Sequence, residues 1–172
     1  MFKNFQKVRR LEKLDIIGST ELVSVENFSN IPAKIDTGAD SSSIWASDIN
    51  VSKDGVLSFS LFGKKSPFYT GEKIERKDYR VLVVRSSNGD EEIRYRTELS
   101  LTLGGRQIKA MFTLAERSKN HFPILIGRRT LKNKFLVDVS LVRVKKTRNP
   151  KTKGLNKELQ ENPFKFHQKY VK

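Results

Sequence analysis

The feature that most constrains the fold is a β-hairpin pattern between residues 99 and 114. Apolar residues occupy alternate positions over 99–103, Gly104-Gly105 follows, and the alternation resumes over 108–114. Alternation with a period of two places one face of a strand against a core, and a glycine pair supplies the positive φ angles of a tight turn. The sequence therefore predicts two adjacent antiparallel strands.

Other short segments have the same β-prone composition. They are residues 22–25, 31–35, 80–84, 93–97 and 135–139. The turn Ser86-Ser87-Asn88-Gly89 lies between two of them, and Asn-Gly there predicts a second hairpin. Residues 51–79 contain another possible hairpin at Phe62-Gly63, and one short helix is expected from Arg128 to Lys134. Many short strands joined by such turns indicate an all-β domain that is closed or strongly curved.

The net charge of +15 is concentrated at the two ends of the chain. Residues 1–13 hold five basic and one acidic residue, and residues 145–172 hold nine and two. We therefore expect a basic N-terminal arm (1–13), a β domain (14–144) and a basic C-terminal tail (145–172). Pro150, Gly154 and Pro163 favour a poorly ordered tail. Such ends could attract nucleic acid, a ribosomal surface or an acidic substrate, or could simply be solvated.

Composition also excludes several classes of protein. The chain has no cysteine, which excludes disulfides and thiolate metal sites and fits a reducing compartment. The first residues are charged and lack the apolar core of a signal peptide, and no run reaches membrane-spanning length. We therefore expect a cytoplasmic protein without membrane contact.

Two segments carry residue types suited to chemistry. In the first, Ile35-Asp36-Thr37-Gly38-Ala39-Asp40, a strand delivers a carboxylate into a glycine-containing turn. The Asp-Thr/Ser-Gly tripeptide arises by chance in about one chain in ten of this length, so an ordinary strand-end Asp is the simple alternative. In the second, residues 123–131, a buried apolar run ends at Gly127 and leads into Arg128. Alone, it would be a core strand followed by a helix.

Together and in this order, the two segments resemble retropepsin-like aspartic peptidases. More narrowly, KIDTGADSSS, RSSNGDEE and FPILIGRRTLKNKFLVDVS resemble the RimB-like group, which is also labelled as ATP-dependent zinc proteases. The resemblance implies a closed retropepsin-type acid-protease barrel, a single lobe with one short helix after Gly127. It also implies an aspartic peptidase in which Asp36 is the catalytic carboxylate.

The resemblance assigns further roles within the turn. Thr37 would hydrogen-bond across a twofold axis, Gly38 would offer its carbonyl to the substrate, and Ala39 completes the motif. Asp40 would pair with Arg128, although a polar turn residue is an equally simple interpretation. Ser86, Asn88 and Gly89 are candidates for a flap over the substrate, or form a polar hairpin tip without that role.

A chain with one Asp-Thr-Gly has one catalytic carboxylate, so the second must come from another subunit. Two carboxylates about 3 Å apart share one proton and provide base and acid together. The partner would be Asp36 of a second copy, which predicts a homodimer. No cofactor is expected: no phosphate-binding loop is present, and zinc is not supported, because His121 and His167 do not form a ligand cluster.

The resemblance implies that the substrate is a peptide or protein. Enzymes resembling the RimB-like group are associated with glutamate ligases, which implies an acidic or glutamylated chain, and Arg85, Arg94 and Arg96 beside the flap fit an anionic substrate. Two alternatives stay open. One is a noncatalytic retropepsin-like module for peptide binding or dimerisation, and the other is a basic accessory protein of the ribosome.

Overall fold

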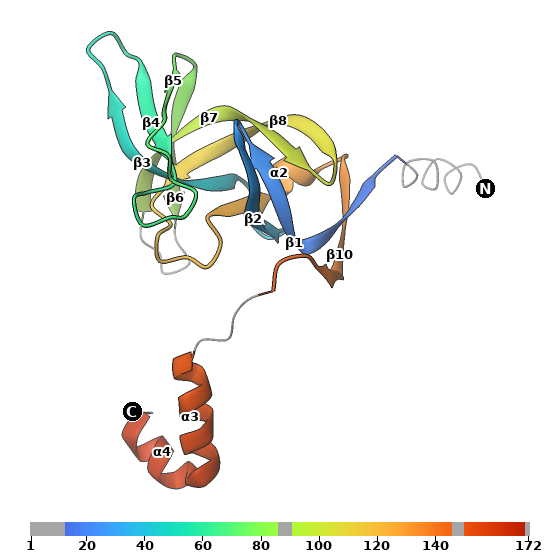
Figure 1. The fold of residues 1–172 in the computed structure, drawn as a ribbon, viewed down its shortest axis with the longest axis vertical. Helices are drawn as coiled ribbons and strands as arrows, with labels where there is room; N and C mark the ends of the chain where they lie inside the picture. The colour runs from blue at the N-terminus through green and yellow to red at the C-terminus, as the bar shows by residue number, and fades with distance from the viewer. Residues whose placement is uncertain (1–12, 86–90, 146–149, 171–172) are drawn as a thin grey trace, which may run out of the picture.

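Strands dominate the fold of the chain, which is drawn in Figure 1. A computed structural model describes residues 13–85, 91–145 and 150–170. The strands are β1 (Asp15–Val25), β2 (Phe28–Asp36), β3 (Ser42–Val51), β4 (Leu57–Leu61), β5 (Lys73–Arg76), β6 (Tyr79–Arg85), β7 (Glu91–Leu103), β8 (Arg106–Ala115), β9 (Ile124–Gly127) and β10 (Phe135–Val142). The helices are α2 (Arg128–Leu131), α3 (Pro150–Glu161) and α4 (Pro163–Tyr170).

Six of the described strands close a barrel in the order β1-β2-β9-β3-β8-β7. The ring is completed where β7 returns to β1, through Ser24 opposite Thr102 and Val25 opposite Leu101. β10 adds to the outside of β1 in parallel, and β6 extends the sheet beyond β7. The predicted closed, single-lobe barrel is confirmed.

The predicted hairpin of residues 99–114 forms the longest antiparallel pairing of the barrel, β7 with β8. Leu99, Leu101 and Leu103 are buried, and Gly104 and Gly105 turn the chain with φ angles of 57° and 81°. These angles suit glycine because a Cβ atom would clash with the backbone in most such conformations. The alternating pattern thus produces the expected strand faces.

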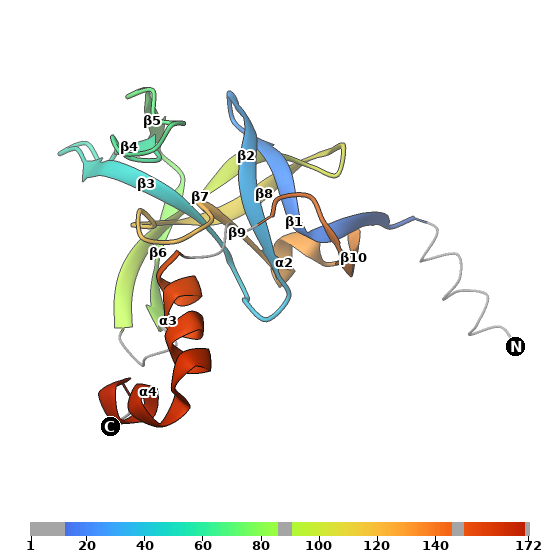
Figure 2. The ribbon, with the colours of Figure 1, turned by 60° about the horizontal axis from the view of Figure 1, so that its bottom comes forward.

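Residues 51–79, which the sequence placed poorly, form an arm at one side of the barrel (Figures 1 and 2). β4 pairs with the end of β3 and with β5. The segment Phe62-Gly63 does lie between two paired strands, but it begins a loop of residues 62–72 rather than a tight hairpin turn. Phe62 has a φ of 64° and is fully buried, because its ring packs on Phe28 and Phe68.

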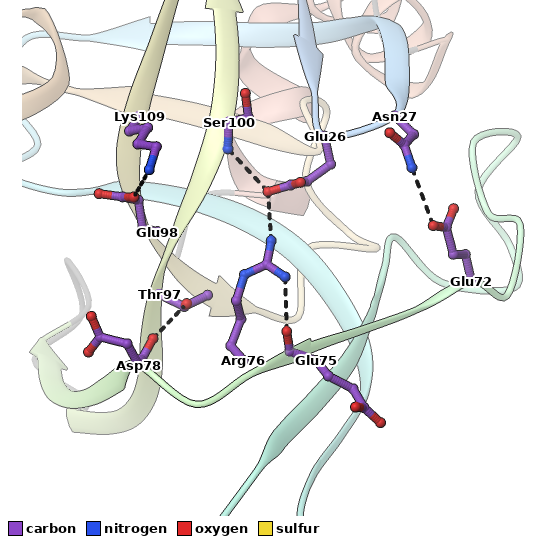
Figure 3. A network of polar contacts seen from close by, with 10 residues as sticks. All are labelled: Glu26, Asn27, Glu72, Glu75, Arg76, Asp78, Thr97, Glu98, Ser100 and Lys109. Carbon is purple, nitrogen blue, oxygen red and sulfur yellow. Dashed lines mark hydrogen bonds and ion pairs between the residues drawn. The ribbon is translucent and has the colours of Figure 1, made fainter.

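Glu26, in the turn between β1 and β2, joins this arm to the barrel (Figure 3). One oxygen, Oε1, accepts a hydrogen bond from the backbone N–H of Ser100 at 3.1 Å and from Arg76 at 2.8 Å. The side chain of Asn27 also donates to Glu72, the residue before β5. The closing seam of the barrel and the base of the arm are therefore held by the same carboxylate.

The second predicted hairpin is formed by β6 and β7, with Tyr79 opposite Thr97 and Arg85 opposite Glu91. Its tip, which contains Ser86, Asn88 and Gly89, lies outside the described residues. The predicted helix after Gly127 is α2, which is shorter than expected.

The C-terminal segment differs from the poorly ordered tail expected above. α3 and α4 form a helical hairpin that lies apart from the barrel (Figures 1 and 2). Pro150 and Pro163 are the first residues of these helices, where proline is favoured because its missing N–H has no helical partner. Glu158 on α3 accepts hydrogen bonds from Lys169 and Tyr170 on α4. Within the described residues, no helix is long and apolar enough to cross a membrane.

Candidate active site

Asp36 is the last residue of β2, directly opposite Gly127 on the parallel strand β9. Its Oδ1 accepts hydrogen bonds from the backbone N–H groups of Gly38 at 3.2 Å and Ala39 at 3.3 Å. The side chain is 29% exposed, and Oδ2 lies 3.6 Å from Nζ of Lys34. The turn therefore fixes one carboxylate oxygen on the backbone and leaves the other beside a cation at the edge of the barrel.

Gly127 supports this turn from behind. A Cβ atom on Gly127 would lie 2.5 Å from the carbonyl oxygen of Ser41 and 2.9 Å from that of Ala39, so only glycine fits. Its N–H donates to the hydroxyl of Ser42, which is buried and lies 2.8 Å from the hydroxyl of Thr130. The strand end that the sequence singled out thus packs directly against the backbone of the Asp36 turn.

Asp40 forms an ion pair with Arg128, as the resemblance implied, and Oδ2 lies 3.7 Å from Arg129. The backbone N–H groups of both arginines donate to the turn, from Arg128 to Ala39 and from Arg129 to Asp40. These ion pairs are exposed and contribute at most about 1 kcal/mol to stability. Their geometric effect is to tie the start of α2 to the Asp36 turn.

Arg117 is a neighbour of Asp36 that the sequence analysis missed. It lies in the loop between β8 and β9, and its Nε donates to the backbone carbonyl of Phe122. Burial and the charge of Arg94 lower the pKa of the Arg117 guanidinium, while the charge of Asp36 raises it. Arginine stays protonated despite such shifts. Lys34 and Arg117 thus bring positive charge to Asp36 from two different elements, and Arg94, which is paired with Glu92, acts on Arg117.

The remaining expected site residues are placed as follows. Thr37 and Gly38 are exposed at the turn, and Ala39 is partly buried beneath it. Thr37 lines a cavity of about 730 Å³ that also contacts α2 and β10, and whose lining does not include Asp36. No pattern in the sequence indicated Arg117, because a single arginine in a polar loop has no periodicity or motif around it.

No group of three or more His, Cys, Asp or Glu side chains in the described part of the chain lies close enough to hold a metal ion. His121 stacks edge-on against Phe122, and His167 lies on α4. Metal-binding sites in proteins need several such ligands in one place.

Comparison with known protein families gives a match. The family described as "Retropepsin-like aspartic endopeptidase RimB" matches residues 16–148. The chain belongs to the RimB-like family. The RimB-like match spans the whole barrel and the Asp36 turn, and it ends before α3.

Two curated relatives, from Shewanella pealeana (strain ATCC 700345 / ANG-SQ1) and Shewanella halifaxensis (strain HAW-EB4), are each 34% identical to this RimB-like chain over 134 residues. Both are named "Probable alpha-L-glutamate ligase". The match covers 73% of this chain but 28% of each relative. The chain therefore corresponds to a part of those longer proteins.

A solved structure has a similar fold. It is a structural-genomics crystal structure of Lpg0085, a protein of unknown function from Legionella pneumophila. The TM-score is 0.55 and the sequence identity 25%, over 74% of this chain and 95% of that one. The shared fold therefore accounts for nearly all of that crystallised chain.

Proposed function

We propose that the protein is an aspartic endopeptidase in which Asp36 and its counterpart from a second copy activate water. The observation that carries this proposal is the Asp36 turn itself. Its backbone N–H groups fix one carboxylate oxygen, and Gly127 and the Asp40–Arg128 pair hold the turn from behind. The two hydrogen bonds also occur in ordinary Asx turns, whereas the close packing of Gly127 and the Asp40–Arg128 pair are additional.

The chemistry follows from two carboxylates that share one proton. The ionised carboxylate takes a proton from water as the water oxygen attacks the peptide carbonyl, and the protonated one donates to the carbonyl oxygen. The resulting tetrahedral intermediate collapses when the C–N bond breaks. The leaving nitrogen accepts the proton that the first carboxylate took from water, and a hydroxyl group of the intermediate returns a proton to the second carboxylate as the new carboxyl group forms. No metal and no covalent intermediate is required.

A second copy would meet the first at the exposed side of the Asp36 turn. Thr37 is exposed there, which fits the expected contact across a twofold axis. Ile16 on β1 and Leu136 on β10 are paired in register and are 60% and 45% exposed. Such an apolar pair at the edge of a sheet favours burial against another molecule. A symmetric contact would use the same patch on both copies.

An acidic chain, such as a glutamylated peptide, is the substrate class that the charges favour. Lys34 and Arg117 bring positive charge to Asp36 and would attract carboxylates of a substrate. The name of the Shewanella relatives refers to L-glutamate, which supports the same class. The cytoplasmic location expected from the sequence stays a prediction.

The purified protein should cleave a peptide of consecutive glutamates faster than a matched peptide of glutamines, and excess EDTA should leave the rate unchanged. Replacing Arg117 by Gln should raise KM for the glutamate peptide roughly tenfold, because a charge-assisted contact is lost. The kcat for that peptide should change less than KM does. Peptide cleavage can be followed by chromatography and mass spectrometry.

The matched control is Lys119→Gln, a lysine on the same loop whose side chain is exposed. This variant should keep KM within about twofold, since an exposed charge contributes little. Equal KM values for the two peptides would contradict the acidic substrate. An equal fall in kcat for both peptides in the Arg117 variant would mean that Arg117 acts on Asp36 instead. Failure to cleave either peptide would count against the peptidase.

A second candidate function concerns the α3–α4 hairpin, which is basic and carries an exposed aromatic ring. Phe164 is 71% exposed, and Lys157 and Lys165 of the same hairpin are also exposed. Basic surfaces with exposed aromatic side chains favour contact with nucleic acid. The hairpin could therefore attach the barrel to a ribosomal surface.

Deletion of residues 145–172 should abolish salt-sensitive cosedimentation with ribosomes while leaving the barrel folded. The physical reason is that this segment carries nine basic and two acidic residues. Sucrose-cushion centrifugation at two salt concentrations, with circular dichroism of the shortened chain, makes the measurement. Undiminished cosedimentation of the shortened chain would rule out this attachment.

A further inference from the structure

A second cavity, of about 350 Å³, lies next to the Asp36 turn and away from Asp36 itself. It is bounded by the start of β3, by α2 and by the part of β8 that precedes its pairing with β3. That pairing begins with Ser42 opposite Phe112, so one backbone edge of residues 108–111 has no strand partner within the described part of the chain. The lining residues are Ser41, Ser42, Arg96, Ile108, Lys109, Ala110, Met111, Arg129, Thr130 and Lys134.

The charge of this lining has one sign. It holds four basic side chains and three hydroxyl groups, and it includes no carboxylate. Two of the cations have an acidic neighbour: Lys109 lies 3.4 Å from Glu98 (Figure 3), and Arg129 lies 3.7 Å from Asp40. These pairs are exposed and long, so they neutralise the cavity only in part.

Arg96 is the lining residue that most directly indicates a ligand. Its Nε atom is buried and has no hydrogen-bond partner among the described residues. Within the same residues, no carboxylate forms an ion pair with it. A buried donor without an acceptor is costly and is rare in folded proteins. The ammonium group of Lys134 donates to two backbone carbonyls, of Thr130 at 3.4 Å and Lys132 at 3.5 Å.

We infer that this cavity is an oxyanion site, which binds a phosphate or carboxylate group between Arg96, Arg129 and Lys134. The guanidinium of Arg96 matches the geometry of both anions. Its Nε is closed to solvent in this structure, so it would gain the missing acceptor when the side chain shifts toward the cavity. The hydroxyl of Ser41 at the cavity wall would add a neutral donor. The inference does not depend on the peptidase proposal, because binding here involves neither Asp36 nor bond cleavage.

The site can be tested by titrating the full-length protein with inorganic phosphate, at constant ionic strength, and following amide resonances by NMR. A saturable response centred on Ser41, Ser42 and residues 108–111 is expected. In a parallel titration, triglutamate is compared with triglutamine. Saturation by phosphate alone assigns the site to a free phosphate group, and saturation by triglutamate but not triglutamine assigns it to a carboxylate of a chain.

Replacing Arg96 by Gln should weaken binding of the saturating anion roughly tenfold, because a charge-assisted donor is lost. Arg80→Gln is the matched control, since Arg80 is exposed, lies opposite Arg96 on β6 and does not line the cavity. Should the Arg96 variant fail to fold, Lys134→Gln provides the same test. Linear shifts without saturation, or equal weakening by the Arg80 variant, would overturn the inference.

Discussion

Replacing Asp36 by asparagine is expected to lower the rate of peptide cleavage by at least about 10³-fold while the protein stays folded. Loss of a positioned acid or base costs about 10²–10⁴-fold, and in a symmetric pair one substitution removes both carboxylates. The fold should persist because an asparagine oxygen can still accept the N–H groups of Gly38 and Ala39. Cleavage assays and thermal unfolding of the same preparation give both quantities.

The matched control is Asp54→Asn, which makes the same chemical change at an exposed turn residue distant in sequence from the Asp36 turn. Its cleavage rate should equal that of the wild type. If the two carboxylates come from two copies, wild-type protein can be co-refolded with an equal amount of the Asp36 variant. The activity should then be about half that of the same amount of wild-type protein refolded alone, because about half of the wild-type copies enter inactive mixed pairs. Cleavage that survives Asp36→Asn in a clean preparation would remove Asp36 from the mechanism.

Gly127→Ala is expected to destabilise the protein by about 3 kcal/mol or more and to abolish cleavage. The added Cβ atom would lie 2.5 Å from the carbonyl oxygen of Ser41, and a backbone atom cannot move aside as the end of a side chain can. Overpacking within a core typically costs about 1–3 kcal/mol, and contact with two backbone carbonyls places this case at the upper end. Urea unfolding followed by fluorescence of Trp45 measures the loss.

Gly154→Ala serves as the comparison, because no atom lies within 4 Å of a Cβ placed there. Gly154 is inside α3, where alanine is favoured over glycine by about 0.5–1 kcal/mol. This variant should therefore leave the barrel unchanged or slightly favour the helix. Equal stability of the Gly127 variant and the wild type would mean that the turn is not packed as described.

Most of the barrel and the centre of the site were predictable because both depend on local sequence. Gly104-Gly105 between two runs of alternating apolar residues strongly predicts a hairpin. The Asp36 turn and Gly127 were recognised because close approach of backbone to backbone requires glycine at a defined point in a motif. The ion pair of Asp40 with Arg128 followed from the same resemblance.

The C-terminal helices, Arg117 and the loop of residues 62–72 could not be predicted in the same way. They depend on contacts between residues far apart in sequence, or on sequence patterns that fit more than one structure. The prolines at 150 and 163 suggested disorder, yet they start helices that Glu158 joins through Lys169 and Tyr170. Arg117 is far from Asp36 in sequence, and the charge of Asp36 acts on it only in the folded chain. The loop of residues 62–72 is held by the aromatic packing of Phe62. No alternating apolar pattern in the sequence indicates this packing.

The order of strand pairing has a consequence for synthesis of the chain. β2, which ends in Asp36, pairs with β9 about 90 residues later, and β1 pairs with β10 more than 110 residues later. Contacts so far apart form slowly, since a long loop must be closed before they are gained. A nascent chain that has emerged only as far as β8 cannot yet support the Asp36 turn, because Gly127 has not been added. The proposed peptidase activity would therefore appear only after nearly the entire barrel has been translated.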